Sequence, residues 1–249
     1  MLTLKRQGGK GSYAPRTLRS IWGQLYTFFS WCSTRHPVRN PMYSLKMPRT
    51  RTAERDMTFW EVSQFRTLIS RVSDPTWRTF FAFQYYTGCR IGETLALQEK
   101  DYTGGAVRID KSLFKQTLTD AYYEIKSTKT SKRRTVPIPS RLKKLLDDYI
   151  LRKRERGIPS DFLFCGKYGG HLPHSTIRRR FDIYTEEAGL PRIKIHDLRH
   201  SYISLLIHKG ANLAVIASLI GDSFEQVTNT YGHMYESDKI NAVRLLDSD

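Results

Sequence analysis

Apolar residues in the first part of the chain recur with helical spacing. Residues 15–35 carry them three or four positions apart, and Pro15 suits the first turn of a helix. Asn40-Pro41 interrupts this pattern, and the polar, basic stretch 47–57 that follows predicts a linker. Because a single long helix cannot close a core of its own, we expect residues 1–46 to be the C-terminal part of a small helical domain.

The following residues are expected to form a second, larger domain over 58–249. A capping-box pattern at Thr58-Phe-Trp-Glu61 predicts a helix that runs to about Val72. Asp74-Pro75 predicts the start of another helix, which ends near Gly88. Further helices are predicted over 90–97, 140–157, 175–188, 195–209 and 212–221, and Ser223-Phe-Glu-Gln226 is a second capping box that opens a helix carrying Tyr231.

Three short runs between these helices are typical of β-strands. They cover residues 106–114, 120–126 and 134–139, and a turn rich in Lys, Thr and Ser joins the last two. We expect them to form one small antiparallel sheet. The sequence contains no internal repeat, and the whole pattern favours an α+β domain that is predominantly helical.

Charge narrows the class of partner. The chain has 41 Lys and Arg against 24 Asp and Glu, a formal net charge of +17. A field of that size attracts polyanions, and each phosphate contact releases condensed counterions. Nucleic acid is therefore favoured as the partner over a basic surface that is merely solvated.

Other features of the composition favour a cytoplasmic protein. No apolar run approaches the roughly 20 residues that span a bilayer, and no apolar stretch follows the basic N-terminus as in a secretory signal. The three cysteines lie far apart and match neither a zinc spacing nor a disulfide framework. We therefore expect a reducing compartment and no membrane partner.

Thr87-Gly-Cys-Arg-Ile-Gly-Glu93 is the first segment with candidate chemistry. Gly88 permits a sharp turn, and Arg90 and Glu93, three apart, share a helix face. An arginine oriented by a carboxylate suits a two-pronged grip on phosphate oxygens. For this segment alone, an ordinary surface ion pair is the commoner interpretation.

His196-Asp-Leu-Arg-His200 is the second such segment. His196 and Arg199 are three apart, and the apolar residues around them place both on the side of the helix away from the core. A proton-transfer group beside a fixed cation suits phosphoryl transfer. A solvated polar face explains the same spacing equally well.

Several basic residues are candidates for contacts with DNA. Lys129 lies in the turn between the second and third strand runs, where it could enter a groove or form part of a phosphate-binding patch. The other candidates for backbone contacts rest on charge alone and are Lys132, Arg133, Arg134, Arg178, Arg179 and Arg180.

Together with Tyr231, these segments resemble the tyrosine recombinases, the family of the phage integrases. Thr-Gly-x-Arg-Ile-x-Glu, Thr-Lys-Thr, His-x-Leu-Arg-His and Asn-Thr-Tyr-Gly-His follow one another as they do in that family, over nearly all of residues 57–236. The sequence looks most similar to integrases of temperate phages and conjugative or integrative elements. Residues 1–46 likewise resemble the end of the family's DNA-binding, core-binding domain.

The resemblance implies a role for each matched residue. Arg90 and Arg199 would clamp the scissile phosphate while Tyr231 attacks the phosphorus, leaving a 3′-phosphotyrosine and a free 5′-hydroxyl. Lys129 is implied as the acid that protonates the departing oxygen. His196 is implied as the group that accepts or orients the tyrosine proton.

The resemblance also bears on supporting residues and cofactors. Glu93 is expected to support an arginine from behind. Tyr235 is the alternative nucleophile, four residues after Tyr231, but Gly232 is expected to loosen the helix between them. Because one phosphodiester replaces another, we expect no need for ATP, a metal ion or another cofactor.

One position departs from the family's pattern. Most members have His or Trp in a Leu-Gly-His-Ser sequence, whereas this chain reads Ile220-Gly-Asp-Ser223. An ionised carboxylate can only accept hydrogen bonds, and it repels a phosphate. We expect Asp222 to support Arg199 or the Tyr231 hydroxyl. The alternative is an impaired relative that binds DNA without cutting it.

Partners and role follow from the same resemblance. Family members act on duplex recombination sites as homotetramers, with accessory DNA-bending or excision factors, and we expect the bacterial cytoplasm or nucleoid. Integration and excision of a mobile element is the expected function. A Xer-like resolvase of replicon dimers and a relaxing enzyme like type IB topoisomerases are alternatives. The apolar residues of the tail could dock on a neighbouring protomer or on their own core, and they are Ile240, Val243, Leu245 and Leu246.

Overall fold

The structure, a computed structural model, divides into two compact units, Met1–Asp56 and Met57–Asp249. It describes residues 13–47, 58–115, 123–127 and 133–235. The predicted linker and the apolar tail residues after Tyr235 therefore lie almost entirely outside the described residues.

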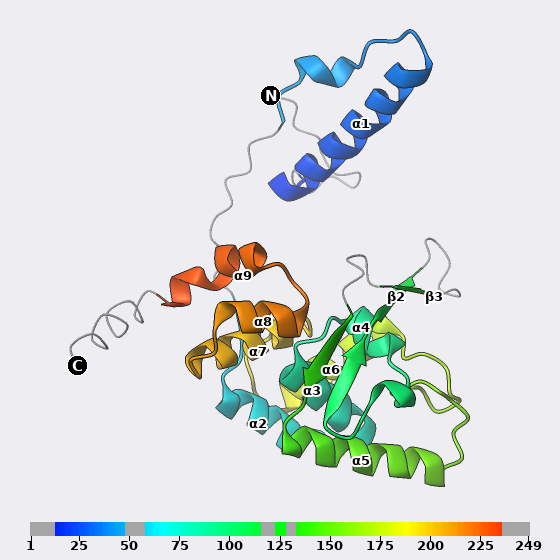
Figure 1. The fold of residues 1–249 in the computed structure, drawn as a ribbon, viewed down its shortest axis with the longest axis vertical. Helices are drawn as coiled ribbons and strands as arrows, with labels where there is room; N and C mark the ends of the chain where they lie inside the picture. The colour runs from blue at the N-terminus through cyan, green and yellow to red at the C-terminus, as the bar shows by residue number, and fades with distance from the viewer. Residues whose placement is uncertain (1–12, 48–57, 116–122, 128–132, 236–249) are drawn as a thin grey trace, which may run out of the picture. The chain divides into compact units, whose positions relative to one another are not determined.

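The described part of the first unit is a long helix and a short turn. Helix α1 spans Pro15–Arg35, as predicted, and is followed by the 3-10 turn η1, Pro41–Ser44 (Figure 1). Asn40 caps η1, because its side-chain oxygen accepts a hydrogen bond from the Met42 backbone N–H at 2.8 Å. No side chain of α1 is buried, so packing within the described part of this unit does little to hold the helix.

The second unit is predominantly helical. Its helices are α2 (Val62–Arg71), α3 (Pro75–Thr87), α4 (Ile91–Ala96), α5 (Ser140–Glu155), α6 (His174–Glu187), α7 (Asp197–His208), α8 (Leu213–Ile220) and α9 (Phe224–Tyr231), with 3-10 turns η2 (Glu99–Asp101) and η3 (Gly232–Tyr235). The helices predicted in this region are confirmed, with bounds that differ by a few residues. The fold class is confirmed as well.

Side-chain caps explain why the starts of α3, α8 and α9 were predictable. The Asp74 carboxylate accepts from the Thr76 N–H at 2.7 Å, and the Asn212 side chain accepts from the Ala214 N–H at 2.7 Å. Ser223 and Gln226 form the predicted reciprocal box, with both hydrogen bonds at 3.1 Å. One start was wrong. Helix α2 begins after Glu61, because the Gln64 amide oxygen accepts from the Glu61 N–H at 2.9 Å.

The strands form two short antiparallel pairs. Strand β1 (Ala106–Ile109) pairs with β4 (Arg134–Pro137), and β2 (Lys111–Lys115) pairs with β3 (Tyr123–Ser127). The single run predicted over 106–114 is therefore two strands. It breaks at Asp110, whose carboxylate lies 3.5 Å from both Arg108 Nε and Lys111 Nζ. In Figure 1 the β2–β3 ribbon extends from the body of this unit.

Two clusters of buried side chains make up the core of the second unit. The larger one contains the aromatic residues of α3 together with Trp60, Phe164 and Phe181. The smaller one joins α7, α8 and α9, which lie together in Figure 1. Tyr231, at the end of α9, is 4% exposed and belongs to this smaller cluster.

None of the described helices combines the length and the hydropathy needed to cross a membrane. Within the same residues, no group of three or more His, Cys, Asp or Glu side chains is arranged to hold a metal ion.

Candidate active site

The turn between α3 and α4 presents Arg90. Gly88 ends α3 with φ of 60°, a left-handed conformation that favours glycine, and Cys89 beside it is 1% exposed. Arg90 is the N-cap of α4. The Glu93 carboxylate accepts hydrogen bonds from the Arg90 backbone N–H at 3.0 Å and from Arg90 Nη1 at 3.2 Å. The pairing predicted from the spacing of Arg90 and Glu93 is thus present, but Glu93 is buried and not on the surface.

Glu93 also holds a second arginine. Its carboxylate accepts from Arg134 Nη2 at 2.6 Å and Nη1 at 3.1 Å, and the Arg134 Nε–H donates to the Leu219 carbonyl at 2.9 Å. The Arg134 side chain is 9% exposed. This inward position does not fit the predicted contact of Arg134 with the DNA backbone. The alternation along β4 indicates the inward position of Arg134, because Arg134 and the buried Val136 are two residues apart and lie on the same face of the strand.

Arg199 lies in the interior of the second unit. Its side chain is 5% exposed, and Nη1 donates to the carbonyls of Gly88 at 2.8 Å and Ile220 at 3.0 Å. The prediction that His196 and Arg199 both project from the side of α7 away from the core was wrong for Arg199. Burial with several acceptors fixes the guanidinium between the ends of α3 and α8.

Asp222 joins the two arginines. Its Oδ2 accepts from Arg199 Nη2 at 2.5 Å, and its Oδ1 accepts from Arg90 Nη2. The contact with Arg199 is one of the two alternatives predicted for Asp222, the other being the Tyr231 hydroxyl, and the contact with Arg90 was not foreseen. Asp222 therefore brings together residues from the start of α4, from α7 and from the α8–α9 turn.

The hydroxyl of Tyr231 is hydrogen-bonded to Nδ1 of His200. Burial raises the pKa of Tyr231 above its ordinary value, and the charge of Asp222 adds to this while Arg199 opposes it. Burial likewise lowers the pKa of His200, against the charge of Asp197. Both groups are therefore neutral near pH 7, and the phenol donates to the imidazole when the ring carries its own proton on Nε2.

His200 is a residue to which the sequence assigned no role. The predicted partner of the tyrosine was His196, which is exposed and whose ring centroid lies 5.6 Å from that of His200. The signal was present in the motif, because residues four apart on a helix lie on the same face. Since His196 is the N-cap of α7, His200 lies one turn further along the same side.

Helix α9 ends at Tyr231, and the backbone continues as the 3-10 turn η3 to Tyr235. The loosening expected at Gly232 thus occurs. The two tyrosines are not successive positions of one regular helix.

The remaining predicted residues are scattered or lie outside the described residues. Lys129 and Lys132 belong to the stretch 128–132, which the structure does not describe. Arg133 is exposed. On α6, Arg179 is exposed, and the Arg178 side chain is 76% exposed with Nε 3.9 Å from Asp182.

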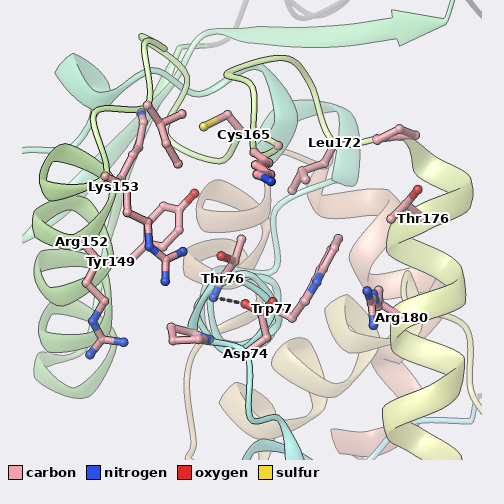
Figure 2. Close-up of a pocket in the computed structure, with 16 residues that line it drawn as sticks. Asp74, Thr76, Trp77, Tyr149, Arg152, Lys153, Cys165, Leu172, Thr176 and Arg180 are labelled. Carbon is pink, nitrogen blue, oxygen red and sulfur yellow. Dashed lines mark hydrogen bonds between the residues drawn. The ribbon is translucent and has the colours of Figure 1, made fainter.

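Arg180 lines a separate cavity of about 760 Å³. Figure 2 shows this cavity between α5 and α6, with Trp77 and the capping residue Asp74 at the start of α3. Arg180 Nε is buried and has no hydrogen-bond partner among the described residues. The lining includes none of the residues around Tyr231.

Comparison with known proteins gives one consistent answer. Residues 55–238 match the model of the phage integrase family. The ICEBs1 integrase of Bacillus subtilis (strain 168) is 30% identical over 84% of this chain, which spans 59% of that protein. A XerC-like tyrosine recombinase of Caldanaerobacter subterraneus subsp. tengcongensis is 26% identical over 97% of this chain and 67% of its own length.

Solved structures show the same fold. The Tn1549 transposon integrase in complex with transposon right end DNA matches 94% of this chain and 80% of its own, with a TM-score of 0.77 and 18% identity. The XerH site-specific recombinase bound to palindromic difH substrate matches 94% of this chain and 68% of its own, with a TM-score of 0.69 and 20% identity.

Proposed function

Since the chain belongs to the phage integrase family, we propose that it cuts and rejoins duplex DNA at specific sites. The observation that carries the proposal is a cluster in which the buried Tyr231 hydroxyl is hydrogen-bonded to His200 and feels the charges of Arg199 and Asp222. The Asp222 carboxylate in this cluster lies between Arg90 and Arg199. Such a setting supplies a nucleophile, an acceptor for its proton and cations for an anionic phosphorus centre.

The proposed reaction exchanges one phosphodiester for another. Tyr231 Oη attacks the scissile phosphorus, and the bond from phosphorus to the 5′-oxygen breaks, so the 3′-phosphate becomes joined to the tyrosine. The tyrosine proton passes to His200 Nδ1. The departing 5′-oxygen takes a proton from a general acid, the role that the sequence motif assigns to Lys129. Attack by a 5′-hydroxyl reverses these steps and rejoins the strand.

The arginines have complementary parts in this proposal. Arg199 is held by two backbone carbonyls, so its guanidinium is fixed before the substrate arrives. Arg90 is 45% exposed and is supported from behind by Glu93, so it can meet a phosphate from solvent. Their outward Nη2 atoms would bind the two non-bridging oxygens. In this scheme His196, at the exposed edge of the site, contacts the phosphate or the neighbouring strand.

The biological role that we propose is integration and excision of a mobile element. The ICEBs1 integrase supports it, as the relative with 30% identity. The XerC-like relative supports the alternative, a resolvase of replicon dimers. A recombination assay separates them, because an integrase joins element ends to a target site whereas a resolvase acts on two copies of one chromosomal site. Duplex DNA as partner, a tetramer on two sites and accessory factors belong to the same proposal.

Trapping on a suicide duplex tests the cutting step. The duplex carries a nick close to the cleavage site, so the short released strand diffuses away and the covalent product accumulates. We expect labelled DNA to stay attached to the denatured wild-type protein and to Tyr235→Phe, and to be absent from Tyr231→Phe. An adduct that survives in Tyr231→Phe and is lost in Tyr235→Phe would move the nucleophile to Tyr235. No adduct with wild type would leave a protein that only binds DNA.

A further inference from the structure

The carboxylate of Asp222 fills the space between the two arginines. Each of its oxygens accepts a hydrogen bond from a different guanidinium, Oδ2 from Arg199 Nη2 at 2.5 Å and Oδ1 from Arg90 Nη2. The two non-bridging oxygens of a phosphodiester have the same charge and offer the same pair of acceptors. The carboxylate and the phosphate therefore compete for the same two donors.

The two anions cannot share this position. An ionised carboxylate has no proton to donate to a phosphate oxygen, and like charges within hydrogen-bonding distance repel strongly away from bulk water. Asp222 must therefore leave the arginines when a phosphate binds to them.

Arg90 and Arg199 can stay in place when the carboxylate leaves. Arg199 keeps its bonds to Gly88 and Ile220, and Arg90 keeps its bond to Glu93. The backbone of Asp222 is also fixed, because its N–H donates to the Ala217 carbonyl at 3.2 Å. A side-chain rotation toward solvent is then sufficient, and Asp222 is already 23% exposed.

Glu93 is a second carboxylate in the same cluster and, unlike Asp222, is held in a way that keeps it in place. It is 2% exposed and accepts hydrogen bonds from Arg134, from the Arg90 backbone and from Arg90 Nη1. Burial alone would raise the pKa of Glu93, but the hydrogen bonds and charge of Arg134 hold it below its usual range. Glu93 binds the inner side of the cluster and leaves the Nη2 atoms of Arg90 and Arg199 to Asp222.

We propose that Asp222 is an internal substitute for the scissile phosphate, which occupies the arginines in the DNA-free protein and is displaced by the substrate. Asp222 thereby sets how strongly the site takes up a phosphate. This inference rests on the proposed function for the identity of the displacing group. It differs from a purely supporting role for Asp222, because a support strengthens phosphate binding whereas a competitor weakens it.

The test measures binding of inorganic phosphate to the DNA-free protein at constant ionic strength, with chloride replaced stepwise by phosphate. Binding is followed by the rise in melting temperature. We expect Asp222→Asn to melt lower than wild type in chloride and to bind phosphate at least about tenfold more tightly, because no carboxylate must first be displaced. Asp222→Glu keeps a competing charge and is expected to bind phosphate as weakly as wild type.

Asp182→Asn is the matched control. Asp182 is also a partly exposed carboxylate between two arginines, with Oδ2 3.0 Å from Arg192 and 3.9 Å from Arg178, but it lies on α6 outside the cluster. Its substitution is expected to leave phosphate binding unchanged. If Asp222→Asn fails to fold in chloride, phosphate is expected to restore its folding.

Several results would overturn the inference. They are an equal or weaker affinity of Asp222→Asn for phosphate, a gain as large in Asp182→Asn, or a failure of phosphate to restore an unfolded Asp222→Asn. The suicide-duplex assay, run in parallel on wild type, keeps the two proposals apart. A phosphate effect without a covalent adduct would reject the proposed reaction alone, and an adduct without a phosphate effect would reject the role of Asp222 alone.

Discussion

Burial shifts the pKa values of the Tyr231 hydroxyl and the His200 imidazole in opposite directions. It raises the pKa of the phenol and lowers the pKa of the imidazole, so the neutral pair is favoured over the ion pair in the DNA-free protein. When Tyr231 attacks the phosphorus, its proton must pass to a base with a free lone pair at hydrogen-bonding distance. Among the described residues, His200 Nδ1 is in that position.

Replacing His200 tests this assignment. We expect His200→Ala to slow adduct formation on the suicide duplex by about 100-fold or more, the usual range for loss of a general base. His196→Ala is the matched control on the same face of α7, and we expect it to lose less. DNA binding is measured for both variants, so that weaker binding is not mistaken for slower cutting. A larger loss for His196→Ala would return the role of proton acceptor to His196.

The pH dependence of cutting follows from the direction of the shift. Because the pKa of His200 is lowered from 6.5, its neutral form is present above that value, and protonation removes it only at lower pH. Adduct formation is expected to be level above pH 6.5 and to fall with acidity. This fall in the rate of adduct formation at acidic pH should be absent from His200→Gln. A rate that keeps rising well above pH 6.5 in the wild type would contradict this.

Folding stability, like the rate of adduct formation, should decrease as the pH falls. Burial lowers the pKa of the half-buried His200, so this residue binds a proton more readily in the unfolded chain than in the folded one. Its contribution to stability is complete above the unfolded value of 6.5 and is lost as the pH falls through the lower folded value.

The residues of the site were predictable to different degrees. The motifs identified Arg90, Arg199 and Tyr231, because their order and spacing form a pattern. The contacts of Asp222 with Arg90 and of His200 with Tyr231 depend on how α4, α7, α9 and the α8–α9 turn pack together, which spacing along the chain does not specify. Charge alone predicts a DNA contact for Arg134, because its buried partner Glu93 lies 41 residues away in the sequence.

Among the elements, the α3–α4 turn has two structural functions. Gly88 ends α3 in a left-handed conformation, and its carbonyl accepts a hydrogen bond from Arg199. The same turn carries Cys89 and Arg90 into the site. A β-carbon built on Gly88 would lie 2.5 Å from Tyr202 Cδ1, a ring in the core of α7. The position therefore requires glycine for its conformation and for its packing.

Gly88→Ala measures the packing requirement when it is compared with Gly104→Ala. Both glycines have positive φ, 60° and 80°, but a β-carbon on Gly104 would meet nothing within 4 Å. Gly104→Ala is expected to lower the free energy of unfolding by about 1–2 kcal/mol through backbone strain. Gly88→Ala should lose roughly a further 1–3 kcal/mol through overpacking. Urea unfolding of both variants checks this, and equal losses would show that Tyr202 yields without cost.

Local signals also explain which elements the sequence predicted well. Helices with a side-chain cap, such as α3, α8 and α9, begin where the capping residue indicates. The break between β1 and β2 cannot be predicted from the pattern of apolar residues. Asp110 and the neighbours with which it forms ion pairs, Arg108 and Lys111, are all polar and leave that pattern unchanged. The start of α2 differs from the prediction because Thr58 is a residue type favoured at an N-cap, whereas the N-cap in the structure is Glu61.

At the scale of the whole molecule, the net charge of +17 does not show which basic side chains are available to contact DNA. Arg134 and Arg199 are neutralised inside the second unit by Glu93 and Asp222. Exposed arginines such as Arg133 and Arg179 are free to release counterions from DNA. Composition thus favours a class of partner, but only burial distinguishes structural from surface cations.

The neighbours Arg133 and Arg134 test this distinction. We expect Arg133→Ala to reduce the slope of log affinity for duplex DNA against log salt by about 1, as for one lost phosphate contact, and to leave stability unchanged. Arg134→Ala should leave the slope unchanged and lower the free energy of unfolding by about 3–5 kcal/mol, because it leaves buried Glu93 short of a partner. Salt titrations and urea unfolding provide the two readouts. The reverse pattern would restore Arg134 as a DNA contact.

The burial of Cys89 has a consequence for the chemistry of the α3–α4 turn. Its thiol is 1% exposed, and burial raises its pKa, so the reactive thiolate is scarce and enclosed. Peroxide and alkylating reagents should leave this sulfur intact while the turn stays folded. The slow rate at which such a reagent modifies Cys89 would then report how often the turn that carries Arg90 opens.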